Sequence, residues 1–373
     1  MATTNASWIK HPGFYISEEL EARGWSQRDL AFILGVSEQA VNMILNGKRG
    51  ITPDTAKAMG DAFEINPETF ANLQKAYDLS HARQPDPGVA VRARMQNYYP
   101  VREMIRRGWI QPSDPAMLES QLVRFFRVPA PDSIPYIAHA AKKSSYEERE
   151  IPPAQLAWLF RVRQIAESIS VPRYSEKSLQ SALTDLQALL YAPELVRQVP
   201  RILMECGIRY MIVEKLPNAK IDGVCFWLDE RSPVIGMSMQ HDRIDNFWFV
   251  LRHEIEHVLQ RHGREQEIID TDLDSASNDL SEEERIANAA AANFCAPKDK
   301  LDSFMARKHP FYYEKDVIAF ARVVNRHPGI VIGQLRKRLN RWDYLTRYLV
   351  KVRQFVLPGS IADGWGQVVP VSL

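Results

Sequence analysis

The clearest chemical pattern in the sequence is an HExxH motif formed by His253, Glu254 and His257. Two histidines four positions apart on a helix lie one turn apart on the same face, so both imidazoles can reach one metal ion. Glu254 lies about 100° around the helix, beside the ion, where it can take a proton from bound water. His262 lies about 140° from His257 on the same geometry and is a poor ligand. The motif predicts a zinc site with Glu254 as the general base.

A catalytic zinc site needs a third protein ligand and an open position. Glu284 is the candidate, on a helix predicted over residues 281–295. Four alanines at 289–292 would let this helix approach the motif helix closely. Ser281 and Glu284 also have the spacing of a capping box, in which Glu284 would fold back onto the Ser281 backbone. Spacing alone leaves both interpretations of Glu284 open.

The elements that must position this site follow from hydrophobic periodicity. Short buried strands are predicted at 208–213, 224–228 and 234–239, and the motif helix is predicted over 243–262. Asp245 is expected to cap the motif helix. The fold class is therefore mainly α with a small β-sheet (α+β), the sheet packing on the motif helix. An acidic loop at 265–284 and the edge of the strand at 234–239 are expected to flank a cleft, where an extended peptide could add to the sheet.

The N-terminal region has the organisation of a DNA-binding module. Residues 13–79 predict five short helices, and a tight turn from Leu34 to Ser37 joins the second and third as a helix-turn-helix. Asn and Gln side chains can read adenine edges in the major groove. The residues expected at this interface are Gln27, Ser37, Glu38, Gln39, Asn42, Met43, Asn46, Lys48 and Arg49. The alternative is a small helical bundle that docks a partner, because residues 1–80 carry 7 Lys/Arg against 10 Asp/Glu and DNA binders usually show a basic footprint.

Both regions resemble known families. The segment SQRDLAFILGVSEQAVNMILNGKR resembles the Xre/Cro-like helix-turn-helix, in particular the form found in HigA-type antitoxins. The block from Asp222 to Pro297 resembles the ImmA/IrrE family of zinc metallopeptidases, a gluzincin-like fold. It carries Gly223 and Trp227 on a strand, then FWFVLRHEIEHVL, and then E-x-x-A-N.

The second resemblance implies roles for particular residues. It makes Glu284, three positions before Ala287-Asn288, the third ligand beside His253 and His257, and Glu254 the general base. Glu256 stands where the family usually has a small residue, and it either faces solvent or narrows and charges the cleft. A site retained for structure alone is a further alternative. His241, Arg243 and Tyr210 are candidates for the oxyanion stabiliser by proximity in sequence only.

Length and composition set the wider frame. A chain of 373 residues suggests two or three domains, and Pro85, Pro87 and Gly88 mark a boundary. The expected division is a helix-turn-helix domain at 1–80, a helical connector at 81–200, a peptidase domain at 201–345 and a C-terminal tail at 346–373. The net charge is +1 and the chain has three cysteines, none in a CxxC pair. With no apolar run of membrane length and no signal sequence, a cytoplasmic, nucleoid-associated protein that does not contact membranes is expected.

The order of the two regions, a helix-turn-helix followed by a metallopeptidase-like domain, leads to two functional hypotheses. The first is a transcriptional regulator that binds double-stranded operator DNA as a homodimer and carries a Zn2+-dependent endopeptidase domain. Its substrate would be a repressor, an antitoxin or the chain's own linker, in a stress, prophage or toxin-antitoxin circuit. The second is a non-catalytic HigA-like antitoxin or repressor whose metal domain binds a cognate toxin, another partner or a ligand.

Overall fold

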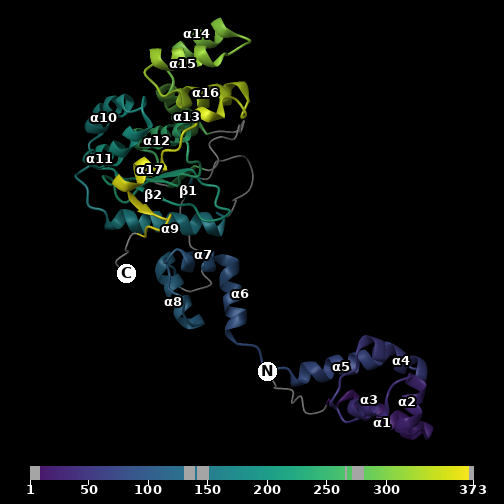
Figure 1. Cartoon of the computed structure of the whole chain (residues 1–373). Coiled ribbons are helices and arrows are strands. Elements are labelled where there is room, and N and C mark those ends of the chain that lie inside the picture. Colours follow the sequence, from purple (N-terminus) through teal and green to yellow (C-terminus); the bar gives the residue numbers. More distant parts are fainter. Residues whose placement is uncertain (1–8, 130–138, 141–150, 265–266, 271–280, 369–373) are drawn as a thin grey trace. The chain divides into compact units, whose positions relative to one another are not determined.

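The computed structural model describes residues 9–129, 139–140, 151–264, 267–270 and 281–368 (Figure 1). The chain separates into two compact units, Met1–Pro87 and Gly88–Leu373. The first unit is wholly helical in its described part, and the second combines helices with one small sheet. The predicted fold class, mainly α with a small β-sheet, is confirmed. Among the described residues, no helix is both long and apolar enough to span a bilayer.

The first unit consists of the five short helices that the sequence predicts. They are α1 (Pro12–Arg23), α2 (Gln27–Leu34), α3 (Glu38–Leu45), α4 (Pro53–Phe63) and α5 (Pro67–His81). Ser26 and Ser37 cap α2 and α3 through their hydroxyls, and Gly35 ends α2 in the left-handed region at φ 66°. These local signals position the two helices, because each satisfies backbone groups that a helix end leaves open. A core that includes Leu30, Val41 and Met59 holds the bundle together.

The second unit is built on a six-stranded sheet with the order β1-β5-β3-β4-β2-β6. Its strands are β1 (His139–Ala140), β2 (Arg209–Val213), β3 (Gly223–Trp227), β4 (Pro233–Met237), β5 (Glu267–Asp270) and β6 (Ile361–Asp363). Strand β3 pairs antiparallel with β4 and β5, whereas β2 pairs parallel with β4 and β6. Strand β4 is therefore internal. The expectation that 234–239 offers a free edge to a substrate peptide is wrong, because β4 already pairs with β2 on one side and with β3 on the other.

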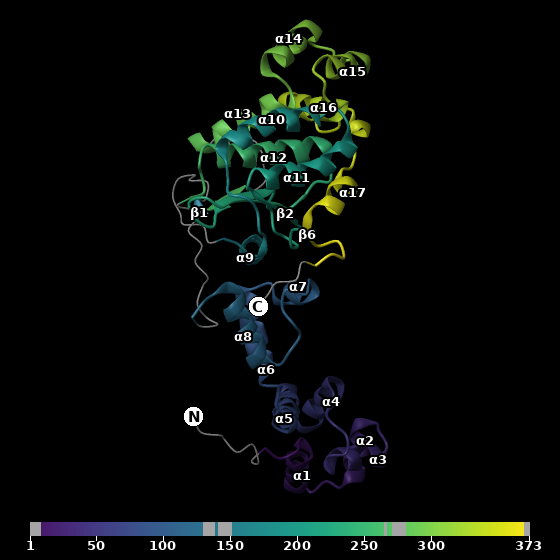
Figure 2. The same cartoon turned by 90° about the vertical axis from the view of Figure 1, so that its left-hand side faces the viewer.

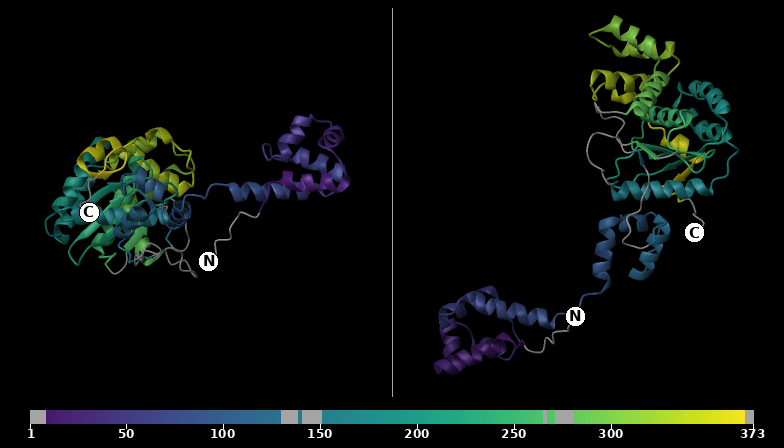
Figure 3. Two further views of the ribbon diagram at one scale, coloured as in Figure 1. Left: turned by 90° about the horizontal axis from the view of Figure 1, so that it is seen from below. Right: turned by 180° about the vertical axis from the view of Figure 1, so that it is seen from behind.

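Alternate side chains of the strands serve two cores, as the period-2 geometry of a strand requires. Met211 and Val213 belong to the core on the side of α9 (Pro153–Ser168). Tyr210 and Ile212 belong to the core on the side of α12 (Ile244–Leu259). Figures 1 and 3 show α9 running along one face of the sheet, and Figure 2 shows α12 against the other. The motif helix thus lies directly on the sheet.

The remaining helices complete these layers. Those grouped with α9 are α6 (Gly88–Tyr98), α7 (Val101–Arg106) and α8 (Pro115–Phe126). Those that share the core of α12 are α10 (Glu176–Ala188), α11 (Val199–Glu205), α13 (Glu282–Cys295) and α17 (Arg353–Val356). A separate small core holds α14 (Lys298–Lys308), α15 (Glu314–Val323) and α16 (Pro328–Leu339).

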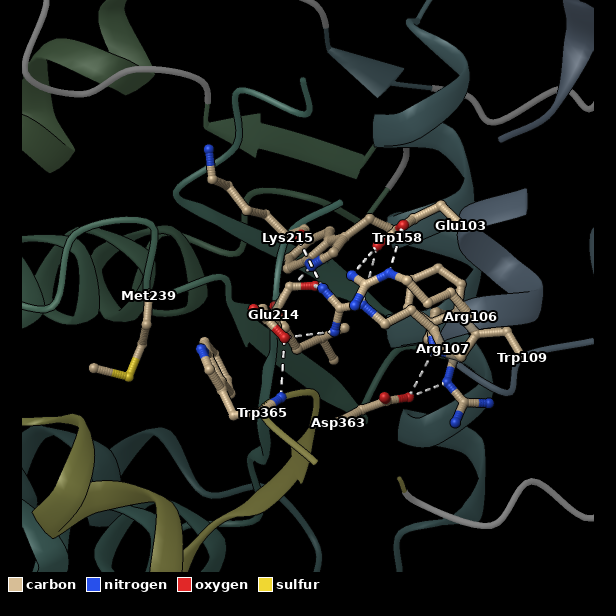
Figure 4. Close-up of polar contacts among 12 residues, drawn as sticks. Glu103, Arg106, Arg107, Trp109, Trp158, Glu214, Lys215, Met239, Asp363 and Trp365 are labelled. Carbon is tan, nitrogen blue, oxygen red and sulfur yellow. Dashed lines mark hydrogen bonds and ion pairs between the residues drawn. The ribbon is translucent and has the colours of Figure 1, made fainter. Parts of the chain in front are cut away.

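A buried polar network joins segments far apart in the sequence (Figure 4). The Asp363 carboxylate, fully buried at the end of β6, accepts a hydrogen bond from the Trp109 indole at 3.0 Å and pairs with the Arg161 guanidinium of α9. Arg107 donates to the Lys215 carbonyl at 2.9 Å and pairs with Glu214. The region expected as a connector and the region expected as a tail are thereby both anchored on the sheet that carries the site.

Candidate metal centre

Helix α12 is buried from Ile244 to Val258, so its motif side chains lie inside the unit. The helix begins after Arg243, which is the N-cap residue and makes no side-chain cap hydrogen bond. The prediction that Asp245 caps the helix is wrong. Asp245 lies in the first turn, where its carboxylate accepts from the Arg243 guanidinium at 3.1 and 3.0 Å. A carboxylate at this position still favours the helix through its dipole.

Three side chains from α12 and α13 meet in one buried cluster. The Nε2 atoms of His253 and His257 are 3.0 Å apart. The Glu284 carboxylate lies 3.6 Å from each of these nitrogens, through one oxygen to each histidine. Both histidines are 0% exposed and Glu284 is 5% exposed. Within the described residues, this is the group whose ligand atoms could hold a metal ion.

The spacing of these donor atoms fits a zinc ion. Bonds of about 2.0–2.1 Å at tetrahedral angles place neighbouring donors about 3.3 Å apart. The observed separations of 3.0 and 3.6 Å bracket that value. Two imidazoles with one carboxylate is also a donor set of catalytic zinc sites, which leave a fourth position open. The residues present therefore fit the metal that the motif predicts.

Glu284 reaches the cluster while its own helix end is capped. The Ser281 hydroxyl accepts a hydrogen bond from the Glu284 backbone N–H at 3.2 Å. The Glu284 carboxylate meanwhile extends to the two histidines. Ser281 thus caps the helix through the backbone, while the Glu284 carboxylate lies where the ligand interpretation places it and not folded back onto Ser281. Ala287 and Ala291, both 0% exposed, form the buried face of α13 and let it pack closely on α12.

Glu254 occupies a space that strand β3 leaves for it. It is 0% exposed, and a Cβ atom on Gly223 would lie 2.0 Å from its Oε1. Any residue other than glycine at the start of β3 would therefore displace this carboxylate. Glu254 follows the candidate ligand His253 in sequence, and the absence of a side chain at position 223 leaves room for its carboxylate.

The structure places three residues near the motif whose roles the sequence left open. Glu256 does not face solvent: it is 8% exposed and accepts hydrogen bonds from Arg252 and Gln260. Burial raises the pKa of Glu256, but the hydrogen bonds from Gln260 and Arg252 outweigh it and hold the pKa below its ordinary value. Tyr210, one oxyanion candidate, is buried in the core, where its hydroxyl donates to Met237 Sδ at 3.4 Å. Arg243, another candidate, pairs with Asp245.

Sequence geometry missed the contact of His262. Its Nδ1 lies 3.0 Å from the Nδ1 of His257. The 140° estimate assumes that the helix continues, whereas α12 ends at Leu259 and the chain turns back. The third oxyanion candidate, His241, has its Nε2 3.3 Å from Gln240 Nε2. Residues 265–266 and 271–280 of the expected acidic loop lie outside the described residues, and Glu267–Asp270 form β5.

In the first unit, the residues expected to contact DNA are all exposed and lie on or beside α2 and α3. They are Gln27, Ser37, Glu38, Gln39, Asn42, Met43, Asn46, Lys48 and Arg49. Three of these side chains form a chain of amide hydrogen bonds: Asn42 donates to Gln27 at 3.2 Å and Asn46 donates to Asn42 at 2.9 Å. Glu38 pairs with Arg28 at 3.1 Å.

Fold and site together define a protein in which a helix-turn-helix unit precedes a metallopeptidase-type domain. Comparison with known families agrees: a helix-turn-helix model matches residues 16–70, and the IrrE N-terminal-like domain of the M78 peptidases matches residues 206–339. The chain is 38% identical over 82 residues to virulence-associated protein I of Dichelobacter nodosus, covering 22% of this chain and 76% of that protein. It is 29% identical over 73 residues to the uncharacterized HTH-type transcriptional regulator YddM of Escherichia coli (strain K12), covering 20% and 78%. The chain belongs to the Xre-like helix-turn-helix family and carries an IrrE-like M78 domain.

Solved structures similar to part of the chain include antidote proteins. An addiction module antidote protein of the HigA family from Coxiella burnetii is 31% identical, covers 28% of this chain and 98% of its own, and has a TM-score of 0.19. The Pseudomonas aeruginosa antitoxin HigA, solved with the higBA promoter, is 36% identical, covers 19% of this chain and 79% of its own, and also has a TM-score of 0.19.

Proposed function

We propose that this chain is a DNA-binding transcriptional regulator whose second unit is a Zn2+-dependent endopeptidase. The observation that carries the proposal is the buried cluster of His253, His257 and Glu284, to which the motif adds the buried Glu254 that Gly223 accommodates.

The proposed mechanism assigns metal binding and proton transfer to different residues. His253, His257 and Glu284 would hold the zinc ion, which when bound polarises a scissile carbonyl and lowers the pKa of water towards about 7. Glu254 accepts the proton of the attacking water and passes it to the leaving amine. Burial of Glu254 and of the ligands keeps competing solvent away from these groups.

The substrate class that we propose is a repressor-type or antitoxin-type protein, or this chain itself. Residues 82–87, which join the two units, are exposed and belong to no helix or strand. Peptidases of this kind act on extended chain, and cleavage in this stretch would separate the first unit from the second. The bonds before Pro85 and Pro87 are the least suited, because proline restricts the backbone.

DNA binding is the proposed role of the first unit, with double-stranded operator DNA as its partner and a homodimer as the bound form. Its support is the exposed amide chain of Gln27, Asn42 and Asn46 on α2 and α3. Lys48 and Arg49 follow directly and are also exposed, where phosphates would be contacted. Asn42→Ala should weaken specific binding by about 1–3 kcal/mol, while Lys48→Ala should weaken binding to all sequences alike and reduce the salt dependence.

The first experiment is the metal content of the purified full-length chain. We expect about one zinc per chain in the wild type, and its loss in both His253→Ala and Glu284→Ala. No metal in the wild type would favour the non-catalytic repressor or antitoxin. Loss in His253→Ala alone would remove Glu284 from the ligand set.

The second experiment tests catalysis with a substrate mixture broad enough that no single substrate has to be chosen. The zinc-loaded chain is incubated with a peptide library prepared from a bacterial proteome, and new termini are identified by mass spectrometry. New termini in the full-length chain itself are scored at residues 82–87. Cuts made by the wild type should be absent with Glu254→Gln, which should keep its zinc. Equal cleavage by that variant would exclude Glu254 as the base.

A further inference from the structure

Helix α12 ends in a hydrogen-bond pattern that folds the following residues back over its last turn. Arg261 takes a left-handed conformation at φ 59°, and its N–H donates to the Val258 carbonyl at 3.1 Å. The N–H of His262 donates to the His257 carbonyl at 2.8 Å. This is a Schellman motif, in which the side chains at the positions of His262 and His257 usually make an apolar contact. Here that contact is a hydrogen bond between two imidazoles, Nδ1 to Nδ1 at 3.0 Å.

Strand β3 holds the backbone of this turn in place. The Trp227 indole N–H donates to the His262 carbonyl at 2.8 Å, and the Trp227 backbone N–H donates to the Gly263 carbonyl at 3.2 Å. Gly263 has φ 77°, and a Cβ atom there would lie 2.6 Å from the Cys225 carbonyl oxygen. The turn thus lies directly against the sheet. The ring of His262 is presented to His257 by fixed backbone on both sides.

We infer that His262 is a positioning residue for the ligand His257, an inference that rests on the proposed zinc site. In a hydrogen bond between two Nδ1 atoms one nitrogen donates and the other accepts. When His257 Nδ1–H donates to His262, the Nε2 of His257 carries no proton and is available to a metal. That Nε2 is the atom that faces His253 Nε2 at 3.0 Å.

The second ring nitrogen of His262 extends the same chain of contacts. With Nδ1 accepting from His257, Nε2 of His262 carries the proton. It faces the Glu283 carboxylate at 3.9 Å. Glu283 is one residue before the ligand Glu284 on α13, so the contact runs from α12 back to the helix that supplies the third ligand.

The test is zinc affinity of the full-length chain, measured by competition with a chromophoric chelator. His262→Phe keeps an aromatic ring over His257 but removes the acceptor, and affinity should fall about 10- to 100-fold. His262→Gln offers an amide oxygen as acceptor and should recover part of that loss. Glu283→Gln should have a smaller effect. Glu282→Gln, on an exposed neighbour paired with Arg285, should have none.

Two further measurements separate positioning from simple structural support. The melting temperature of the zinc-free His262→Phe chain should match that of the wild type. The visible spectrum of the cobalt-substituted protein should change in His262→Phe and return towards the wild type in His262→Gln. Wild-type zinc affinity in His262→Phe, or equal losses in the Phe and Gln variants together with a lowered melting temperature, would overturn the inference. A wild type without zinc would instead refute the proposed metal site, and this inference with it.

Discussion

At the scale of single residues, the candidate site depends on the small size of Gly223 as well as on its own side chains. Gly223→Ala would place a methyl group where the Glu254 carboxylate now lies, 2.0 Å from Oε1. The carboxylate is the far end of a flexible side chain and can move, so we expect the fold and the zinc content to be retained. Cleavage should fall at least about 100-fold, the usual contribution of a positioned general base. The peptide-library assay with parallel zinc analysis measures both, and unchanged cleavage would contradict the argument.

The three cysteines give a second prediction at this scale. Cys206, Cys225 and Cys295 are all buried, and none of them forms a disulfide. Burial raises the pKa of Cys295 to about 12 and also raises the pKa of Cys206. The thiolate is the reactive form, so the native chain should show no fast reaction with a thiol reagent at pH 8. Three thiols should react in denaturant, and one fast thiol in the native protein would refute the burial of its residue.

At the scale of elements, Ser281 connects helix capping with the proposed metal binding. Its hydroxyl caps α13 through the Glu284 N–H, and Glu284 is a ligand candidate. Ser281→Ala should cost about 1 kcal/mol of stability and should also weaken zinc binding. Ser175→Ala is the matched control, because Ser175 caps α10 in the same way through the Ser178 N–H. It should cost a similar amount in urea unfolding and leave zinc affinity unchanged; equal effects of the two variants on zinc would contradict a link through Glu284.

The elements also show what the sequence could and could not predict. The five N-terminal helices, strands β2, β3 and β4, and helices α12 and α13 carry local signals such as caps, turns and periodicity. Strand order depends on pairing between distant segments, and no local signal reveals that β4 is internal. The contact of His262 with His257 was missed for a similar reason. It arises where a regular helix ends, and the 3.6-residue period no longer applies there.

At the scale of the whole chain, the core of the second unit crosses the divisions expected from sequence. Trp158 and Val162 of α9 share one core with Val224 and Phe226 of β3. The expected connector at 81–200 therefore contributes helices, α9 above all, that pack on one face of the sheet. The expected tail likewise supplies β6, which pairs with β2. Pro-rich stretches suggest boundaries in a sequence, but only packing reveals whether the chain separates there.

The polar network at Asp363 allows a test of whether the C-terminal segment is a structural part of the second unit. Asp363 and Arg161 are 0% and 2% exposed, and the carboxylate also accepts from the Trp109 indole. Removing one partner of a buried ion pair leaves the other charge buried, which costs about 3–5 kcal/mol. Asp363→Ala should therefore destabilise the second unit by that amount, and Asp363→Asn by less, because the amide oxygen can still accept from Trp109.

Calorimetry of the full-length chain should show the transition of the second unit lowered by on the order of 10 °C and that of the first unit unchanged. Asp299→Ala, at an exposed aspartate of the same unit, is the control. If Asp363→Ala shifted the melting temperature no more than this control, the C-terminal segment would not be a structural part of the unit that carries the candidate metal site.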